Sequence, residues 1–254
     1  MKIEGSVAFI TGAAMGVGKN VAEALLKEGA KVALADVAVE QGEATAGDFK
    51  KAYGDGRVFF VKCNVADEQS FKDAFASAVS HYGHIDLMLN NAGLVNEQRW
   101  KMMCSVNIDG VVIGTQLAVE HMRKDKGGRG GVIINTASMV GLVTRFVFPV
   151  YVASKHAVVG FTNSWAGNPY LGDMGLRFGT VCPTAVDTAF QKFKDEQLLY
   201  PEEFKQMLKA ISLMGVDQAV EGFLTIIKDD GSNGRNLAIT KDGSKYAHNQ
   251  LVDG

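Results

Sequence analysis

The sequence predicts an α/β domain: a doubly wound parallel sheet of about seven strands with helices on both faces. Short apolar runs alternate along the chain with longer segments of helical periodicity. Hydrophobic residues make up 47% of the 254 residues, enough to cover both faces of a sheet. No linker rich in Pro, Gly or Ser and no repeat interrupts the pattern, so we expect one domain over 1–254.

The strand predictions rest on apolar runs too short for core helices. They cover 7–11, 31–36, 58–63, 86–90, 132–136, 177–182 and, near the C-terminus, 237–240. The first intervening helix is marked by a stripe of Val21, Leu25 and Leu26, and Gly29 follows as a C-terminal cap. Strand–helix–strand repetition implies parallel strands joined by right-handed crossovers.

Charge and composition narrow the class of protein. The net charge is −2 and basic residues form only short clusters such as Lys50-Lys51, so we expect no nucleic-acid partner. No apolar stretch reaches the roughly 18 residues of a membrane span, so none is predicted. The first apolar piece, 7–10, runs into a glycine-rich turn rather than a cleavage site, which is untypical of a signal peptide.

Cysteine and histidine usage indicates neither disulfides nor metal. The three cysteines, Cys63, Cys104 and Cys182, are an odd number without metal-site or redox spacing. We interpret them as reduced thiols of a cytoplasmic protein. The five histidines show no ligand pairing, so no metal site is predicted.

A glycine-rich turn follows the first predicted strand. Residues 11–18 read Thr-Gly-Ala-Ala-Met-Gly-Val-Gly and lead into a helix. The first N–H groups and the dipole of such a helix suit phosphate oxygens, and glycine lets the backbone approach a pyrophosphate. Taken alone, the motif is equally consistent with a tight turn that holds no ligand.

Asp36 favours a dinucleotide. It ends the second predicted strand, 18 residues after Gly18, close to the ~20-residue offset of a ribose-binding acid. A carboxylate there accepts hydrogen bonds from ribose hydroxyls and repels a 2′-phosphate by several kcal/mol. With Val37 beside it and no nearby arginine, NAD is favoured over NADP. An ordinary surface-turn aspartate is the alternative.

Tyr151 and Lys155 predict acid/base chemistry. Four residues apart, they share one face of a helix, and Ser138 stands 13 residues before Tyr151. A phenol with a pKa of ~10 is too weakly acidic to act as a base at neutral pH. An ammonium ~4 Å away would lower the phenol pKa by about three. We expect the phenol to exchange a proton with a carbinol or carbonyl oxygen that Ser138 holds. A core tyrosine and a strand-end serine are the alternatives.

These motifs together resemble the short-chain dehydrogenase/reductases. The resemblance rests on Gly-x-x-x-Gly-x-Gly, Asn90-Asn-Ala-Gly93, Ser138 and Tyr151-x-x-x-Lys155, and it extends over nearly the whole chain. It implies a Rossmann-type fold and a catalytic set of Asn107, Ser138, Tyr151 and Lys155. The matching asparagine of the family distorts its helix, here a pattern over 97–124, and its carbonyl helps to hold a relay water. A solvated helix asparagine is the alternative.

The resemblance also implies the binding residues. Thr188 matches a residue that bonds the nicotinamide carboxamide. For NAD the implied set is Gly12, Met15, Gly16, Val17, Gly18, Asp36, Val37, Asn64, Val65, Asn91, Ala92, Gly93, Tyr151, Lys155, Pro183, Val186 and Thr188. For the substrate it is Ser138, Val140, Phe148, Tyr151, Thr184, Ala185 and Phe190.

Within this family, the stretches 90–100, 127–137, 151–161 and 224–234 are similar to NAD-dependent 15-hydroxyprostaglandin dehydrogenases. Those enzymes oxidise an allylic secondary alcohol on a long apolar chain and are homodimers. The similarity implies a homodimer here too, with a tetramer as the alternative. Its helix contacts would include Val150, Ala153 and Phe161.

Three positions depart from that pattern. Phe148 replaces a glutamine that hydrogen-bonds the substrate oxygen, so we expect a more apolar surrounding of the carbinol. Asn64 replaces an aspartate, and its amide oxygen can still accept from the adenine amine. Thr184 replaces a glycine and brings a Cβ near the expected nicotinamide.

Residues 189–214 are rich in large apolar side chains and predict a substrate cover. Packing against the sheet is the alternative. We therefore expect 1–140 to bind mainly the cofactor, and 141–254 to supply the catalytic helix, the cover and the last strand. The predicted function is hydride transfer between NAD and an apolar secondary alcohol or ketone. A hydroxysteroid-type dehydrogenase and a catalytically idle NAD-binding regulatory protein are the alternatives.

Overall fold

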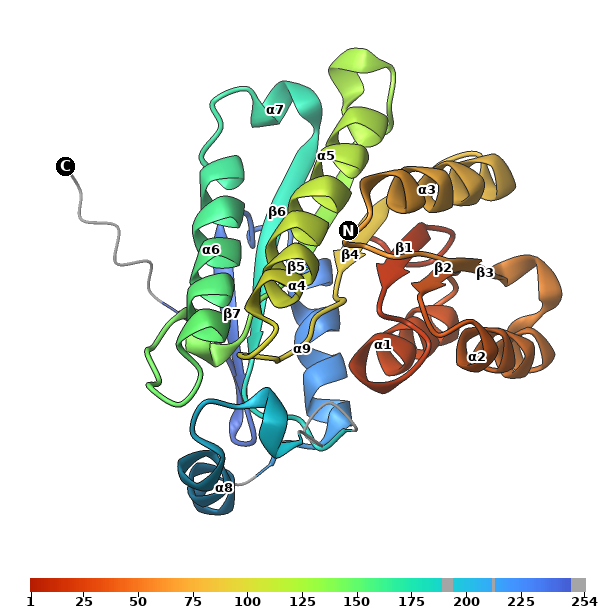
Figure 1. Cartoon of the computed structure of the whole chain (residues 1–254). Helices are drawn as coiled ribbons and strands as arrows, with labels where there is room; N and C mark the ends of the chain where they lie inside the picture. Colours follow the sequence, from red (N-terminus) through yellow and green to blue (C-terminus); the bar gives the residue numbers. More distant parts are fainter. Residues whose placement is uncertain (189–193, 212, 248–254) are drawn as a thin grey trace.

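The computed structural model describes residues 1–188, 194–211 and 213–247 (Figure 1). One eight-stranded sheet runs through them in the order β3-β2-β1-β4-β5-β6-β7-β8. All neighbouring strands pair in parallel except β7 and β8. The strands are β1 Val7–Thr11, β2 Lys31–Asp36, β3 Val58–Lys62, β4 Leu87–Asn90, β5 Gly131–Thr136, β6 Leu176–Pro183, β7 Arg235–Thr240 and β8 Gly243–Ala247.

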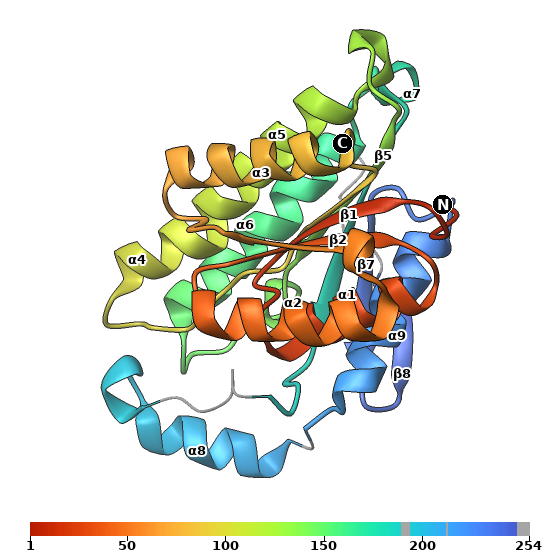
Figure 2. The same ribbon diagram turned by 90° about the vertical axis from the view of Figure 1, so that its right-hand side faces the viewer.

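Helices cover both faces of the sheet, as Figure 2 shows. One layer holds α1, α2 and α9, and the other α3, α5 and α6. Alternate residues of each strand enter the two layers, so Ile10 packs on the first and Phe9 on the second. The helices are α1 Gly16–Lys27, α2 Val39–Tyr53, α3 Glu68–Tyr82, α4 Trp100–Cys104, α5 Gly110–Met122, α6 Pro149–Ala166, α7 Leu171–Met174, α8 Pro201–Ala210 and α9 Val216–Lys228.

The predicted fold class is confirmed, and each predicted strand lies within one or two residues of its expected bounds. The strand count is eight rather than about seven, because β8 was missed. Its sequence Gly-Ser-Lys-Tyr-Ala carries no apolar run, since as an edge strand it lies largely exposed beside β7.

The strand order fixes a crevice at the carboxyl ends of β1 and β4. In the sheet, β2 pairs with one edge of β1, and β4 pairs with the opposite edge of β1. The segments that follow β1 and β4 therefore meet, and Asn91 joins them by hydrogen bonds to Thr11. Ligands of doubly wound sheets bind at such a switch point.

The predicted helix over 97–124 is found as one run from Trp100 to Met122, in which a π-helical turn, η2 Ser105–Asp109, separates α4 from α5. Of the helices in the described residues, this run has the length and apolarity of a membrane span. Its buried residues Ala118 and Met122 pack on the sheet with α3, as in the core helix of a globular protein.

Candidate active site

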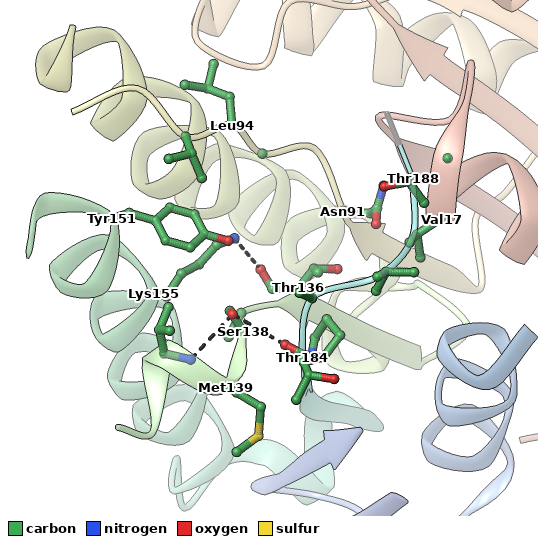
Figure 3. Close-up of a pocket in the computed structure, with 18 of the residues that line it drawn as sticks. Val17, Asn91, Leu94, Thr136, Ser138, Met139, Tyr151, Lys155, Thr184 and Thr188 are labelled. Atoms are coloured by element: carbon green, nitrogen blue, oxygen red, sulfur yellow. Dashed lines mark hydrogen bonds between the residues drawn. The ribbon is translucent and has the colours of Figure 1, made fainter. Parts of the chain in front are cut away.

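A cavity of about 950 Å³ opens at the crevice, and Figure 3 shows part of its wall. All residues that the sequence predicts for NAD line this cavity. So do the predicted substrate residues, apart from Phe190, which lies outside the described residues. Asn107 is fully buried behind the wall. The structure thus brings together groups that lie up to about 176 positions apart in the sequence.

The glycine turn between β1 and α1 has room for a diphosphate. Gly12 and Gly16 have φ angles of +65° and +60°, which residues other than glycine rarely adopt. A Cβ on Gly18 would lie 2.2 Å from the carbonyl oxygen of Gly12, so this position excludes any larger residue. α1 has neither a side-chain cap nor an acidic residue in its first turn. An anion therefore fits its N-terminus.

Asp36 lies beside this turn at the end of β2. Its Oδ2 accepts a hydrogen bond from the Ala14 amide at 2.9 Å, and its Oδ1 accepts one from the Ala38 amide at 3.0 Å. The carboxylate thus holds the turn in place. Each carboxylate oxygen has a second acceptor site, so both bonds are compatible with ribose hydroxyls as further donors.

Ser138, Tyr151 and Lys155 meet on the opposite wall (Figure 3). Ser138 follows β5 at the start of the short turn η4 (Met139–Gly141), and its hydroxyl donates to the Pro183 carbonyl oxygen at 3.3 Å. Tyr151 and Lys155 lie one turn apart in α6 and are buried. The Lys155 Nζ donates to the Thr136 carbonyl oxygen at 2.8 Å and lies 5.7 Å from the Tyr151 ring centroid.

Burial dominates the protonation of this pair. It raises the pKa of Tyr151 well above its ordinary value, and the hydrogen bond with Ser138 lowers it only in part. Burial also lowers the pKa of Lys155 to about 8. The expected lowering of the Tyr151 pKa by Lys155 is therefore wrong for this arrangement. The expectation counted the attraction between the charges and left out the desolvation of each charged form.

Comparison with known proteins decides the family. The family model described as short chain dehydrogenase matches residues 6–199, more than half of the chain. The chain belongs to this short-chain dehydrogenase family. The family prediction is confirmed.

Individual relatives agree with this assignment. Human NAD(+)-dependent 15-hydroxyprostaglandin dehydrogenase is 38% identical over 259 residues, which cover 100% of this chain and 97% of that protein. Secoisolariciresinol dehydrogenase of Forsythia intermedia is 33% identical over 266 residues, which cover 100% and 89%. A solved short-chain dehydrogenase/reductase of Burkholderia phymatum in complex with NAD superposes with a TM-score of 0.81 at 24% identity, covering 95% and 90%. This last similarity concerns the fold alone.

In this short-chain dehydrogenase, Asn107 stands within the π-helical turn η2. Its Oδ1 accepts from the Leu94 amide at 2.9 Å, and its Nδ2 donates to the Leu94 carbonyl oxygen and to Ser154 Oγ. The helix is thus distorted at this residue, as expected. The side chain ties the segment after β4 to α6, and a role of its backbone carbonyl stays a prediction.

Phe148, at the position where the similar enzymes have glutamine, is buried in the wall of the cavity. It is 6% exposed and packs edge-on against Tyr151, with 5.7 Å between ring centroids. Its other neighbour is Phe204 of α8, at 5.9 Å. The apolar cluster around it includes Val95, Met103, Val147, Val152, Leu198, Met207 and Leu208. The surroundings of Tyr151 are therefore apolar on this side.

The sequence analysis missed several residues of the cavity wall, among them Thr136 and Leu94. Thr136 supplies the acceptor for Lys155 through its backbone carbonyl, which residues of any type possess, so no side-chain signal could reveal it. Leu94 lines the cavity as an apolar residue in an irregular segment, where no periodicity marks it.

Burial of Lys155 predicts a pH-dependent stability. Below about pH 8 the Lys155 amine is charged in both the folded and the unfolded chain. Because its pKa falls from 10.5 to about 8 on folding, this buried charge lowers the free energy of unfolding by about 3 kcal/mol. Between these values only the unfolded chain holds the proton, so the free energy of unfolding rises with pH. Lys155→Met should therefore be more stable than the unaltered protein at pH 7 by up to about 3 kcal/mol, with a smaller difference at pH 10.

Urea unfolding of both proteins at pH 7, 8.5 and 10 measures this difference. A gap that is constant or widens with pH would show that Lys155 does not carry a buried charge at neutral pH.

Proposed function

We propose that this short-chain dehydrogenase transfers a hydride between NAD and an apolar secondary alcohol or ketone. One observation carries the proposal: Asp36 and the glycine turn line the same cavity as Ser138, Tyr151 and Lys155. A dinucleotide whose adenosine and diphosphate lie at Asp36 and the glycine turn would place its nicotinamide end beside Ser138, Tyr151 and Lys155. The relative named a 15-hydroxyprostaglandin dehydrogenase supports NAD and an alcohol substrate.

The roles follow from where the groups lie. Ser138 holds the reacting oxygen by hydrogen bonding, and Tyr151 exchanges the proton of that oxygen. NAD, when bound, would supply the nicotinamide ring as the hydride acceptor or donor. Because burial keeps Tyr151 protonated, it serves directly as the acid in ketone reduction. In alcohol oxidation it must first lose its proton. Lys155 is the neighbouring titratable group, and its pKa, lowered to about 8, lets it release and take up a proton closer to neutral pH than an exposed lysine could.

The wall around Tyr151 supports an apolar substrate. Phe148 offers the carbinol region an aromatic ring and no hydrogen bond. From α8, Phe204, Met207 and Leu208 line the same cavity. These side chains suit a lipid, terpenoid or steroid alcohol, and a hydroxysteroid-type alcohol is the second candidate.

The first test is NADH formation with NAD⁺ and a panel of prostaglandin, steroid, terpenoid and short-chain secondary alcohols. We expect turnover with at least one long apolar alcohol, and Tyr151→Phe should lower it by a factor of ~10² or more while the binding of NADH is kept. Near-normal turnover of Tyr151→Phe would refute the mechanism. Tight NAD binding with no turnover of any alcohol would instead favour an idle, NAD-binding regulatory protein.

Asp36 should select NAD over NADP. Asp36→Ser removes the charge that repels a 2′-phosphate and keeps a short hydrogen-bonding side chain, so the Kd for NADPH should fall and that for NADH should rise. Titrations followed by nicotinamide fluorescence measure both constants. A preference of the unaltered protein for NADPH would contradict the assigned role.

We also propose that two copies associate through α6. Four apolar residues follow one another at helical spacing on this helix: Ala153 and Ala157 are exposed, and Val150 and Phe161 are partly buried. Static light scattering should give twice the mass of the chain. The mass of a single chain would refute the proposal, and four times that mass would indicate the tetramer.

A further inference from the structure

A buried glutamate outside the predicted catalytic set contacts the helix that carries Tyr151. Glu97 lies in the segment between β4 and α4 and is 3% exposed. Its Oε1 accepts a hydrogen bond from the Tyr151 amide at 2.8 Å, and its Oε2 accepts one from the Val150 amide at 3.1 Å. Because a buried carboxylate is costly unless it is hydrogen-bonded, this contact is a specific feature.

The first turn of α6 depends on this carboxylate. Phe148 at the N-cap position has no side-chain acceptor, and Pro149 after it has no N–H. The Val152 amide already donates to the Phe148 carbonyl oxygen at 3.0 Å. The amides of Val150 and Tyr151 are therefore the ones left without a partner within the helix, and Glu97 accepts from both.

The same segment is also hydrogen-bonded to the residues just before α8, which belong to the predicted substrate cover, 189–214. The Glu97 amide donates to the carbonyl oxygen of Gln197 at 2.8 Å, in the short turn η6 (Asp195–Gln197) that precedes α8. The Gln98 side chain donates to the Leu198 carbonyl oxygen at 3.3 Å. Glu97 thus joins the turn before α8, through its own backbone and side chain, to the backbone of Tyr151.

We propose that Glu97 is a positioning residue for Tyr151 and that it couples the placement of the cover to the placement of the phenol. The proposal rests on the proposed function. The carboxylate fixes the first turn of α6, and the turn fixes the direction in which Tyr151 points toward Ser138. Displacement of an acid/base group by about 1 Å can lower turnover by a factor of ~10². Glu97 acts through this geometry and does not touch the reacting atoms.

Glu97→Gln tests the role, because a carboxamide has one acceptor oxygen and can satisfy only one of the two amides. We expect kcat to fall by a factor of about 10 or more, with a change in KM and in the Kd for NADH of less than about threefold. The kinetic isotope effect on kcat with a carbinol-deuterated alcohol should rise, because the chemical step becomes slower relative to product release. Glu120→Gln, the same change at an exposed position on α5, is the matched control and should leave every quantity unchanged.

Hydrogen exchange gives a readout that needs no substrate. In Glu97→Gln the amides at 150–151 should exchange faster than in the unaltered protein, whereas the rest of α6 keeps its protection. This measurement separates the two proposals: an unaltered protein without dehydrogenase activity contradicts the proposed function, whereas unchanged exchange contradicts the contact itself.

The inference is overturned if kcat of Glu97→Gln stays within twofold of that of the unaltered protein. It is also overturned if kcat falls only in proportion to the fraction of molecules that no longer bind NADH. If Glu97→Gln does not fold, Glu97→Asp replaces it. This variant keeps the charge but is one methylene too short to reach both amides, and its kcat should also fall by several-fold at an unchanged number of NADH sites. Normal kcat in Glu97→Asp would refute the positioning role.

Discussion

The parallel pairing of β1 with β2 on one side and with β4 on the other is the constraint on which the site depends. It turns the carboxyl ends of these strands toward one crevice, because the two following connections run to opposite sides of β1. The glycine turn after β1 and the segment after β4 then meet in van der Waals contact, and a Cβ on Gly12 would lie 2.9 Å from the Ala92 Cα. The cavity is the space that these connections leave open.

Burial within this frame sets the chemistry. Tyr151 and Lys155 are buried, Tyr151 within an apolar cluster, and desolvation disfavours the charged form of each. The phenol therefore stays a proton donor, and the lysine loses its proton at a lower pH than an exposed lysine does. A more polar wall would stabilise the charged forms but would also admit water beside the reacting carbon. The aromatic ring of Phe148 is consistent with a site that excludes water.

Two buried polar side chains connect the segment after β4 to its surroundings at α6. Asn107, in the π-helical turn η2, binds Leu94 and Ser154, and Glu97 binds the first turn of α6. Both link the segment after β4 to the catalytic helix, so the same segment that borders the cofactor side of the cavity also holds α6. Full satisfaction of such buried groups makes an arrangement specific as well as stable.

The sequence by itself determined the fold class, the strand positions and most of the cavity wall. Local periodicity encodes strands and helices, and the glycine turn, Asp36, Ser138, Tyr151 and Lys155 carry chemistry in their side chains at recognisable spacings. The edge strand β8 was missed because exposed pairing needs no apolar pattern.

Only the tertiary structure decided the protonation of Tyr151 and Lys155 and the support behind them. Desolvation depends on which distant side chains surround a group, and no spacing along the chain reports it. Glu97 lies 54 positions before Tyr151 in an irregular segment, so its contact with α6 exists only once β4, α4 and α6 have packed together. Long-range contacts of this kind have no local periodicity, and for this reason the sequence determined the chemical groups of the site, whereas the fold decided their charge and alignment.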